Sequence, residues 1–128
     1  MPQRKFGLLA IAIAFLLSGC SVKITGIYTN MHFVGNGGNV QGVEMLIVRG
    51  DGDEYFAVLQ CANGAPGKPV VVSATVPTQE NIEVAANSDP ASHCPKTQFK
   101  GKVGPSGITG SFAGGPEMSL ERKDSYWQ

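Results

Sequence analysis

The stretch Thr97-Gln98-Phe99-Lys100-Gly101-Lys102-Val103 decides the fold class, because polar and apolar residues alternate along it with a period of two. Successive side chains of an extended chain point to opposite faces, so its apolar residues share one face and its lysines share the other. After the turn-like sequence Gly104-Pro105-Ser106, the same alternation resumes over residues 107–113. Residues 97–113 therefore predict a β-hairpin with one buried face and one solvent-facing face.

Similar short runs recur along the chain, and no segment beyond the first twenty residues has the longer period of an amphipathic helix. The runs lie at 22–29, 40–49, 54–61, 70–76, 81–86 and 117–122. The chain has 17 Gly and 8 Pro in 128 residues, and many of them fall in the links between runs, where turns need them. We therefore expect an all-β protein with eight strands in an up-and-down antiparallel meander.

An open meander would leave two unpaired edge strands, which invite aggregation. Closure into a small barrel removes both edges, and an eight-stranded barrel has room inside for side chains or one small ligand. Gly26, Gly101 and Gly110 fall at inward positions, where glycine relieves crowding and allows a strand to coil. A two-sheet β-sandwich is the alternative architecture.

The links of a meander alternate between its two ends, and their lengths differ between those ends. The second, fourth and sixth links, at 50–53, 77–80 and 104–106, are as short as hairpin turns. The first, third and fifth links, at 30–39, 62–69 and 87–96, are longer, and the seventh, at 114–116, is short. We call the end with the three long links the mouth, and the opposite end the base.

The N-terminal residues indicate export. Arg4 and Lys5 precede a run of apolar residues and glycine at 6–17, which is too short to cross a bilayer and is typical of a secretory signal peptide. The run ends in Leu17-Ser18-Gly19-Cys20, which resembles the lipobox of bacterial lipoproteins. The resemblance implies cleavage before Cys20 and acylation of its thiol. An ordinary signal peptide with a coincidental cysteine is the alternative.

This interpretation divides the chain into a signal peptide at 1–19, a lipidated anchor with a short linker at 20–23, and a single barrel domain at 24–128. By resemblance to lipoprotein sorting, Ser21 rather than Asp after the lipidated cysteine implies the outer membrane, facing the periplasm, in a Gram-negative cell. The lipid on Cys20 would hold the barrel by its base. The C-terminus returns to the same end, where Tyr126 and Trp127 would lie near headgroups or plug the barrel.

Cys61 and Cys94 remain once Cys20 is assigned to the lipid, and an even pair in an oxidising compartment predicts one disulfide. Both cysteines fall at the mouth, which agrees with the expected topology. Two buried free thiols are the alternative. A metal pair is disfavoured because the two cysteines are far apart in sequence and lack CxxC spacing.

Charge and motifs exclude several function classes. Removal of residues 1–19 leaves eight Lys and Arg against ten Asp and Glu, with no basic patch, so we expect no nucleic-acid partner. No GxSxG elbow is present, and His32 and His93 with Asp89 lack a local metal-ligand spacing. We therefore expect no enzyme activity, no metal and no cofactor.

The remaining hypothesis is a lipid-anchored binding module that contacts a partner, such as an envelope protein, through loops at the mouth. The residues chosen for this role are Met31, His32, Phe33, Asn63, Lys68, Asp89 and His93. Phe33 in a polar, glycine-rich link would either form a contact surface or fold over the barrel as a lid. The alternatives are a carrier of a small apolar ligand in the interior, and an inhibitor of a cell-wall hydrolase or protease.

One internal pattern also resembles a family. Ile24-Thr25-Gly26-Ile27-Tyr28-Thr29-Asn30 is similar to the first strand of calycin barrels, the avidin and lipocalin class, and Ile108-Thr109-Gly110-Ser111-Phe112 is similar to their glycine-rich late strands. Tyr28 stands where Trp is usual, and the interior tryptophans that line the biotin site of avidin are missing, so biotin binding is not implied. The signature segments of small lipid-anchored lysozyme inhibitors, Tyr-x-Cys and Ser-Gly-Ser, are also not found.

Overall fold

The computed structural model describes residues 22–123, and these residues form one antiparallel sheet with almost no helix. The strands are β1 (Gly26–Thr29), β2 (His32–Val34), β3 (Asn39–Arg49), β4 (Tyr55–Pro66), β5 (Val70–Thr75), β6 (Asn81–Val84), β7 (Phe99–Gly104), β8 (Gly107–Phe112) and β9 (Met118–Arg122). A single 3-10 turn, η1 (Pro90–Ser92), lies in the link between β6 and β7. The predicted signal peptide, Cys20, Ser21, Tyr126 and Trp127 lie outside the described residues.

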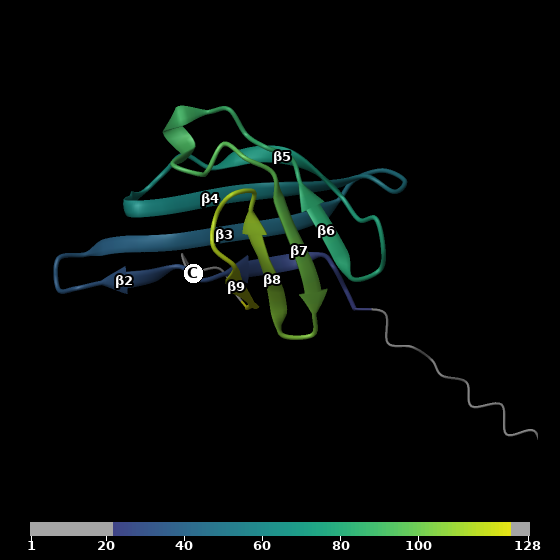
Figure 1. The fold of residues 1–128 in the computed structure, drawn as a ribbon, viewed down its shortest axis with the longest axis horizontal. Helices are drawn as coiled ribbons and strands as arrows, with labels where there is room; N and C mark the ends of the chain where they lie inside the picture. Colours follow the sequence, from purple (N-terminus) through teal and green to yellow (C-terminus); the bar gives the residue numbers. More distant parts are fainter. Residues whose placement is uncertain (1–21, 124–128) are drawn as a thin grey trace, which may run out of the picture.

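The sheet closes on itself. Neighbouring strands follow the order β1-β9-β8-β7-β6-β5-β4-β3-β2, and β1 pairs with both β9 and β3. Eight antiparallel strands therefore form a closed barrel, and β2 is an additional strand paired with the first residues of β3, Asn39 to Gln41 (Figure 1). The predicted eight-stranded barrel is confirmed, and the two-sheet sandwich is not the architecture.

The inward side chains follow the predicted alternation and pack into one core. Within β3 and β4, burial falls on alternate residues, as it does for Met45 and Ile47 on β3 and for Ala57 and Leu59 on β4. The bulkiest fully buried side chain is that of Tyr28, followed by Phe99 and Met45. The described part of the chain contains no helix long and apolar enough to span a membrane.

Two facing glycines make room for the Phe99 ring. Gly101 and Gly110 are directly opposite each other on β7 and β8. A Cβ atom on Gly110 would lie 2.3 Å from the Lys100 carbonyl oxygen and 2.8 Å from Phe99 Cζ. The Phe99 ring fills this space and meets the Phe112 ring edge-on, with centroids 5.2 Å apart. The inward glycines predicted from the sequence thus allow large aromatic side chains to fill the interior.

Tyr28 and Arg122 close the base. The Tyr28 hydroxyl donates a hydrogen bond to the Ile24 carbonyl at 2.6 Å, and the Arg122 guanidinium lies 4.7 Å above the Tyr28 ring. Arg122 also donates to Tyr28 Oη and to the Thr25 and Lys23 carbonyls, so it fastens the segment before β1 to β9. Burial raises the pKa of Tyr28, although the nearby positive charge of Arg122 lowers it in part.

Candidate binding surface at the mouth

Strands β3 and β4 are about twice as long as the other barrel strands, with 11 and 12 residues against four to six. Residues 39–43 of β3 pair only with β4 and with the segment that leads into and includes β2. These three strands therefore continue past the closed part of the barrel, on the β2 side of Figure 1. We call residues 31–34, which include β2, together with residues 39–43 and 61–66 the arm.

The arm corrects the prediction that residues 30–39 and 62–69 are loops. β1 and β2 share one register against β3, since Thr29 faces Glu44 and His32 faces Gln41. The chain from 26 to 34 is thus one strand interrupted near Asn30, and residues 35–38 form the turn into β3. Asn63 lies inside β4, and not in a loop. Phe33 is 64% exposed on β2, so it does not fold over the barrel as a lid.

Asn30 and Gly42 build the point where the arm leaves the barrel. Asn30 N–H donates to the Val43 carbonyl at 3.0 Å, and Val43 N–H donates to Asn30 Oδ1 at 2.7 Å. The side chain of Asn30 thus takes over a backbone role in the ladder. Gly42 has a φ of 124°, and a Cβ there would lie 2.8 Å from both the Asn30 carbonyl oxygen and Met31 Cα. Only glycine fits this close approach.

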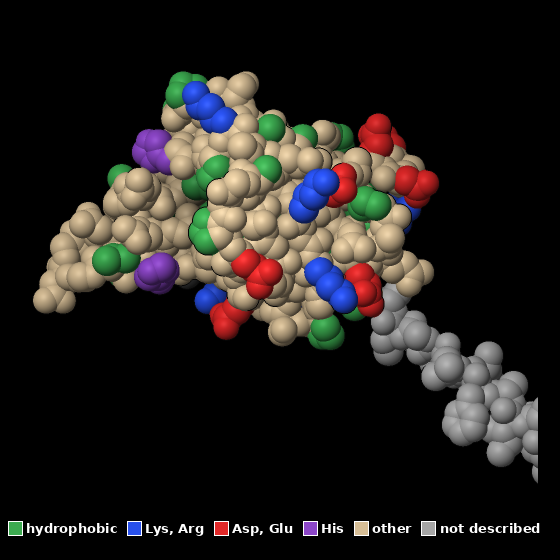
Figure 2. Space-filling view, in the orientation of Figure 1, with side chains coloured by type: hydrophobic (Ala, Val, Ile, Leu, Met, Phe, Trp, Pro, Cys, Tyr) green, Lys and Arg blue, Asp and Glu red, His purple; other side chains and the backbone are tan. Residues whose placement is uncertain are grey.

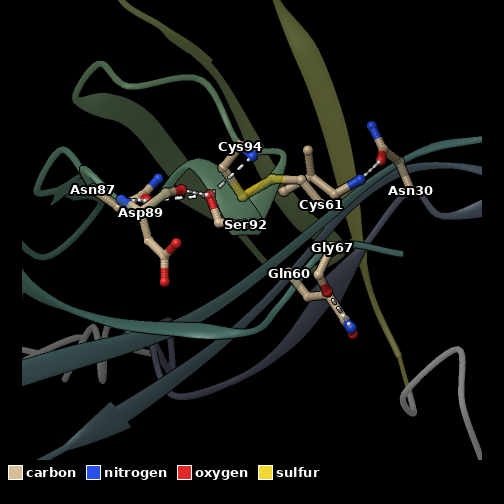
Figure 3. The surroundings of a disulfide bond; sticks show 9 residues. Asn30, Gln60, Cys61, Gly67, Asn87, Asp89, Ser92 and Cys94 are labelled. Carbon is tan, nitrogen blue, oxygen red and sulfur yellow. Dashed lines mark hydrogen bonds between the residues drawn. A yellow bond between two sulfur atoms is a disulfide. The ribbon is translucent and has the colours of Figure 1, made fainter. Parts of the chain in front are cut away.

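The disulfide joins the beginning of the arm to the β6–β7 link. Cys61 faces Val43 in the β3–β4 register and is bonded to Cys94, with a Cα–Cα distance of 5.1 Å (Figure 3). The predicted pairing is therefore confirmed. Gly67 N–H donates to the Cys61 carbonyl at 2.8 Å, and Gln60 Nε2 donates to the Gly67 carbonyl at 3.1 Å. These bonds fix the end of β4 beside the disulfide.

Ser92 organises the link that carries Cys94. The side chain of Ser92 is fully buried, and Cys94 N–H donates to its Oγ at 3.1 Å. Its hydroxyl lies 2.8 Å from the Asp89 carbonyl and 3.1 Å from Asn87 Oδ1, the two acceptors available to it (Figure 3). Asn87 Oδ1 also accepts from Asp89 N–H at 3.0 Å. Internal hydrogen bonds thus hold the link together.

Asp89 caps the 3-10 turn and pairs with Lys68. Its carboxylate accepts from Ala91 N–H at 2.9 Å and from Lys68 Nζ at 3.1 Å. The Ala91 N–H bond, followed by the bond from Lys68, lowers the pKa of Asp89. Because this ion pair is solvent-exposed, it ties the β4–β5 and β6–β7 links together with little net stabilisation.

The two histidines differ in their local structure. His93 has a φ of 59° and is the only non-glycine residue with a positive φ among residues 22–123. A left-handed conformation costs a non-glycine residue about 1–2 kcal/mol, and His93 adopts it as the C-cap residue that ends η1. His32 Nδ1 lies 2.9 Å from the Asn30 carbonyl, and its ring is exposed on β2. Figure 2 shows both histidines at the end of the molecule from which the arm projects.

The two faces of the arm differ. On one face Met31, Val40 and Ala62 form a small buried cluster, separate from the barrel core, so Met31 is a packing residue. On the other face His32, Gln41 and Asn63 lie abreast on three adjacent strands, because His32 faces Gln41 and Gln41 faces Asn63. All three residues of this row are exposed. We call them the polar row.

The arm contains no Lys, Arg, Asp or Glu. No Lys, Arg, Asp or Glu occurs between Lys23 and Glu44, or between Glu54 and Lys68. In Figure 2 the projecting end accordingly has no red or blue side chains, while charged groups lie on the body of the molecule. Exposed strands more often carry charged residues, which prevent unwanted pairing. An uncharged exposed surface is therefore a specific property of this part of the chain.

The structure thus brings His32 and Asn63 together on the arm, and Lys68, Asp89 and His93 together around the β6–β7 link. Gln41, which completes the polar row, was missed because it was placed inside a strand and not at the mouth. The alternation along β3 gave no signal of its exposure, because Gln41 has the same parity as the buried residues Val43 and Met45. Residues 22–123 contain no group of three or more His, Cys, Asp or Glu side chains that could hold a metal ion. Comparison with models of known families, with curated proteins and with solved structures finds no match to this chain.

Proposed function

We propose that this protein is a lipid-anchored, non-enzymatic binding module of the cell envelope, and that it contacts a partner protein through the arm and the neighbouring link. The polar row carries this proposal. It presents one imidazole and two carboxamides at strand spacing, which is about 4.8 Å, on an uncharged surface. Such a surface supplies hydrogen-bond donors and acceptors without the desolvation cost of a buried charge.

The left-handed backbone conformation of His93 is a second observation in favour of binding at this end of the protein. A residue held in the left-handed conformation at a cost to stability indicates that its side chain is retained for another purpose. His93 follows directly after the buried Ser92 and precedes Cys94, so its exposed ring is displayed by an anchored segment. The barrel interior is a weaker candidate, because Tyr28, Phe99 and Met45 occupy it. This occupancy favours the arm over the carrier hypothesis. An inhibitor of a cell-wall hydrolase or protease would use the same arm.

The binding part is tested by Gln41→Glu combined with Asn63→Asp, which keeps side-chain size and adds two negative charges to the polar row. Gln79→Glu, which adds one negative charge to the turn between β5 and β6 at the base, is the control for added surface charge. We expect in-cell photo-crosslinks formed from position 32 to disappear in the arm variant and to persist in the control. Equal crosslinking in both variants, with unchanged thermal unfolding, would contradict the proposal. Removing residues 31–34 is a poorer test because it also removes the buried Met31.

The anchor is tested separately. We expect cells supplied with labelled palmitate to label the wild-type chain and not Cys20→Ala, and the membrane fraction to lose the variant. Labelling of Cys20→Ala, or membrane retention without it, would refute lipidation at this residue. Neither result depends on the arm, so the two halves of the proposal fail independently.

A further inference from the structure

Two asparagines of this chain, Asn36 and Asn63, are followed directly by glycine. The backbone nitrogen of a residue can attack the carboxamide of a preceding asparagine. Glycine favours this attack, because it has no side chain to shield the nitrogen and its backbone rotates freely. The other asparagines, Asn30, Asn39, Asn81 and Asn87, precede Met, Val, Ile and Ser. The two Asn-Gly pairs are therefore the chemically reactive ones, and they lie in different surroundings.

The Asn36-Gly37 pair lies in the turn between β2 and β3, at residues 35–38. Both residues are exposed, and no atom lies within 4 Å of a Cβ placed on Gly37. Within residues 22–123, the Gly37 N–H and the Asn36 carboxamide make no hydrogen bond. Neither of the two reacting groups is therefore held in place.

The Asn63-Gly64 pair is held by the sheet, although Asn63 is also exposed. The β3–β4 register pairs Gly64 with Val40. On β3 the peptide groups of Val43 bond to Asn30, away from β4, and peptide groups alternate in direction along a strand. Those of Val40 therefore face β4, and Gly64 N–H donates to the Val40 carbonyl. Attack on Asn63 would have to break this bond and rotate the backbone of Asn63 out of the ladder.

We infer that Asn36 is a site of spontaneous deamidation in the folded protein and that the sheet protects Asn63. Gly37 N bonds to Asn36 Cγ and gives up its proton, while the carboxamide nitrogen leaves with that proton as ammonia. The product is a cyclic succinimide. Water then adds to either ring carbonyl and breaks its bond to nitrogen, which yields aspartate or isoaspartate. The net reaction consumes one water and releases one ammonia, without an oxidant, a reductant or an enzyme.

This reaction changes the charge of the projecting hairpin. No Lys, Arg, Asp or Glu occurs between Lys23 and Glu44, so the new carboxylate at position 36 is the first formal charge in that stretch. It lies on the same hairpin as His32 and Gln41 of the polar row. The inference goes beyond the proposed function, because the reaction requires neither a partner protein nor the lipid anchor.

The inference is tested by incubating the folded full chain at neutral pH and following both sites by peptide mass spectrometry. We expect Asn36 to convert over days, and Asn63 to convert at least about tenfold more slowly, since tenfold corresponds to about 1.4 kcal/mol, the upper range for one hydrogen bond. The reduced chain unfolded in urea is the control, and there both sites should convert at similar rates. Equal rates at the two sites in the folded chain, or an unreacted Asn36, would overturn the inference.

Two variants locate the reaction at this turn. Asn36→Gln lengthens the side chain by one methylene and should remove the acidic species that ion-exchange chromatography detects in aged wild-type protein. Gly37→Ala restricts the backbone of the attacking residue, and we expect it to slow the reaction on the order of tenfold without a change in thermal unfolding, because its methyl group meets no atom. An acidic species that forms as fast in both variants as in the wild type would refute Asn36 as the site.

Discussion

Replacing Gly110 with alanine should destabilise the barrel severely, because the added methyl group has no space. Its Cβ would lie 2.3 Å from the Lys100 carbonyl oxygen, 2.6 Å from Gly101 Cα and 2.8 Å from Phe99 Cζ. Two of these atoms belong to the backbone of the paired strand β7, which cannot move without breaking the ladder. Overpacking of a core typically costs 1–3 kcal/mol, and contacts with backbone fall at the upper end, so we expect a loss of about 3 kcal/mol or more.

A domain of this size loses roughly 4–8 °C in Tm for each kcal/mol, so the expected decrease is about 12–24 °C by calorimetry or circular dichroism. Gly101→Ala should cost less, because its closest contacts are side-chain atoms of Ile108 and Phe99 at 2.6 and 2.9 Å. Gly37→Ala is the matched control, since nothing lies within 4 Å of its Cβ position. A Tm for Gly110→Ala within 3 °C of the control, on the order of 0.5 kcal/mol, would refute the close packing of the interior.

Three further predictions concern the mouth and the base. Changing both Cys61 and Cys94 to Ser opens a loop with a sequence separation of 33, and we expect a loss of about 3–4 kcal/mol in urea unfolding; an unchanged midpoint would contradict this. The pKa of Asp89 is lowered in the folded protein, so its contribution is present at neutral pH and lost as the pH falls below the ordinary carboxyl range; Asp89→Asn should flatten the stability profile there, and an identical acid profile would count against the cap. Because burial raises the pKa of Tyr28, its contribution to the free energy of unfolding should be full below the ordinary tyrosine pKa and lost as the pH rises past that value. Tyr28→Phe should remove this alkaline loss at a cost of about 1–2 kcal/mol at neutral pH. Unfolding measured at pH 7 and above pH 10 tests both effects.

The barrel was predictable because its strands obey a local rule. Alternation of buried and exposed residues in 97–103 and 107–113 matches β7 and β8 closely. Link lengths gave the placement of Cys61 and Cys94 at one end, and the disulfide confirms it. Closure of the barrel was predicted because unpaired edge strands are unfavourable. The pairings of β1 with β9 and with β3 provide this closure.

The arm was not predictable from local composition. Residues 30–39 contain glycine and asparagine at a density typical of loops, and a loop was expected there. Residues 35–38 do form a turn, but the preceding residues stay in the β1 register against β3. Register depends on the partner strand and not on the segment itself. The contact of Arg122 with Tyr28 was missed for the same reason, since 94 positions separate the two residues.

Stability and the proposed recognition lie in different sets of residues, which makes the function open to experiment. The interior depends on Tyr28, Phe99 and the glycines that accommodate them, so a change there alters folding before it alters any surface. The three polar-row residues are exposed, and changes at exposed sites usually alter stability by no more than about 0.5 kcal/mol. Retaining His93 in a strained conformation opposes stability, which is the direction expected where binding and not folding determines the residue. A loss of binding in polar-row variants with unchanged unfolding can therefore be attributed to the surface itself.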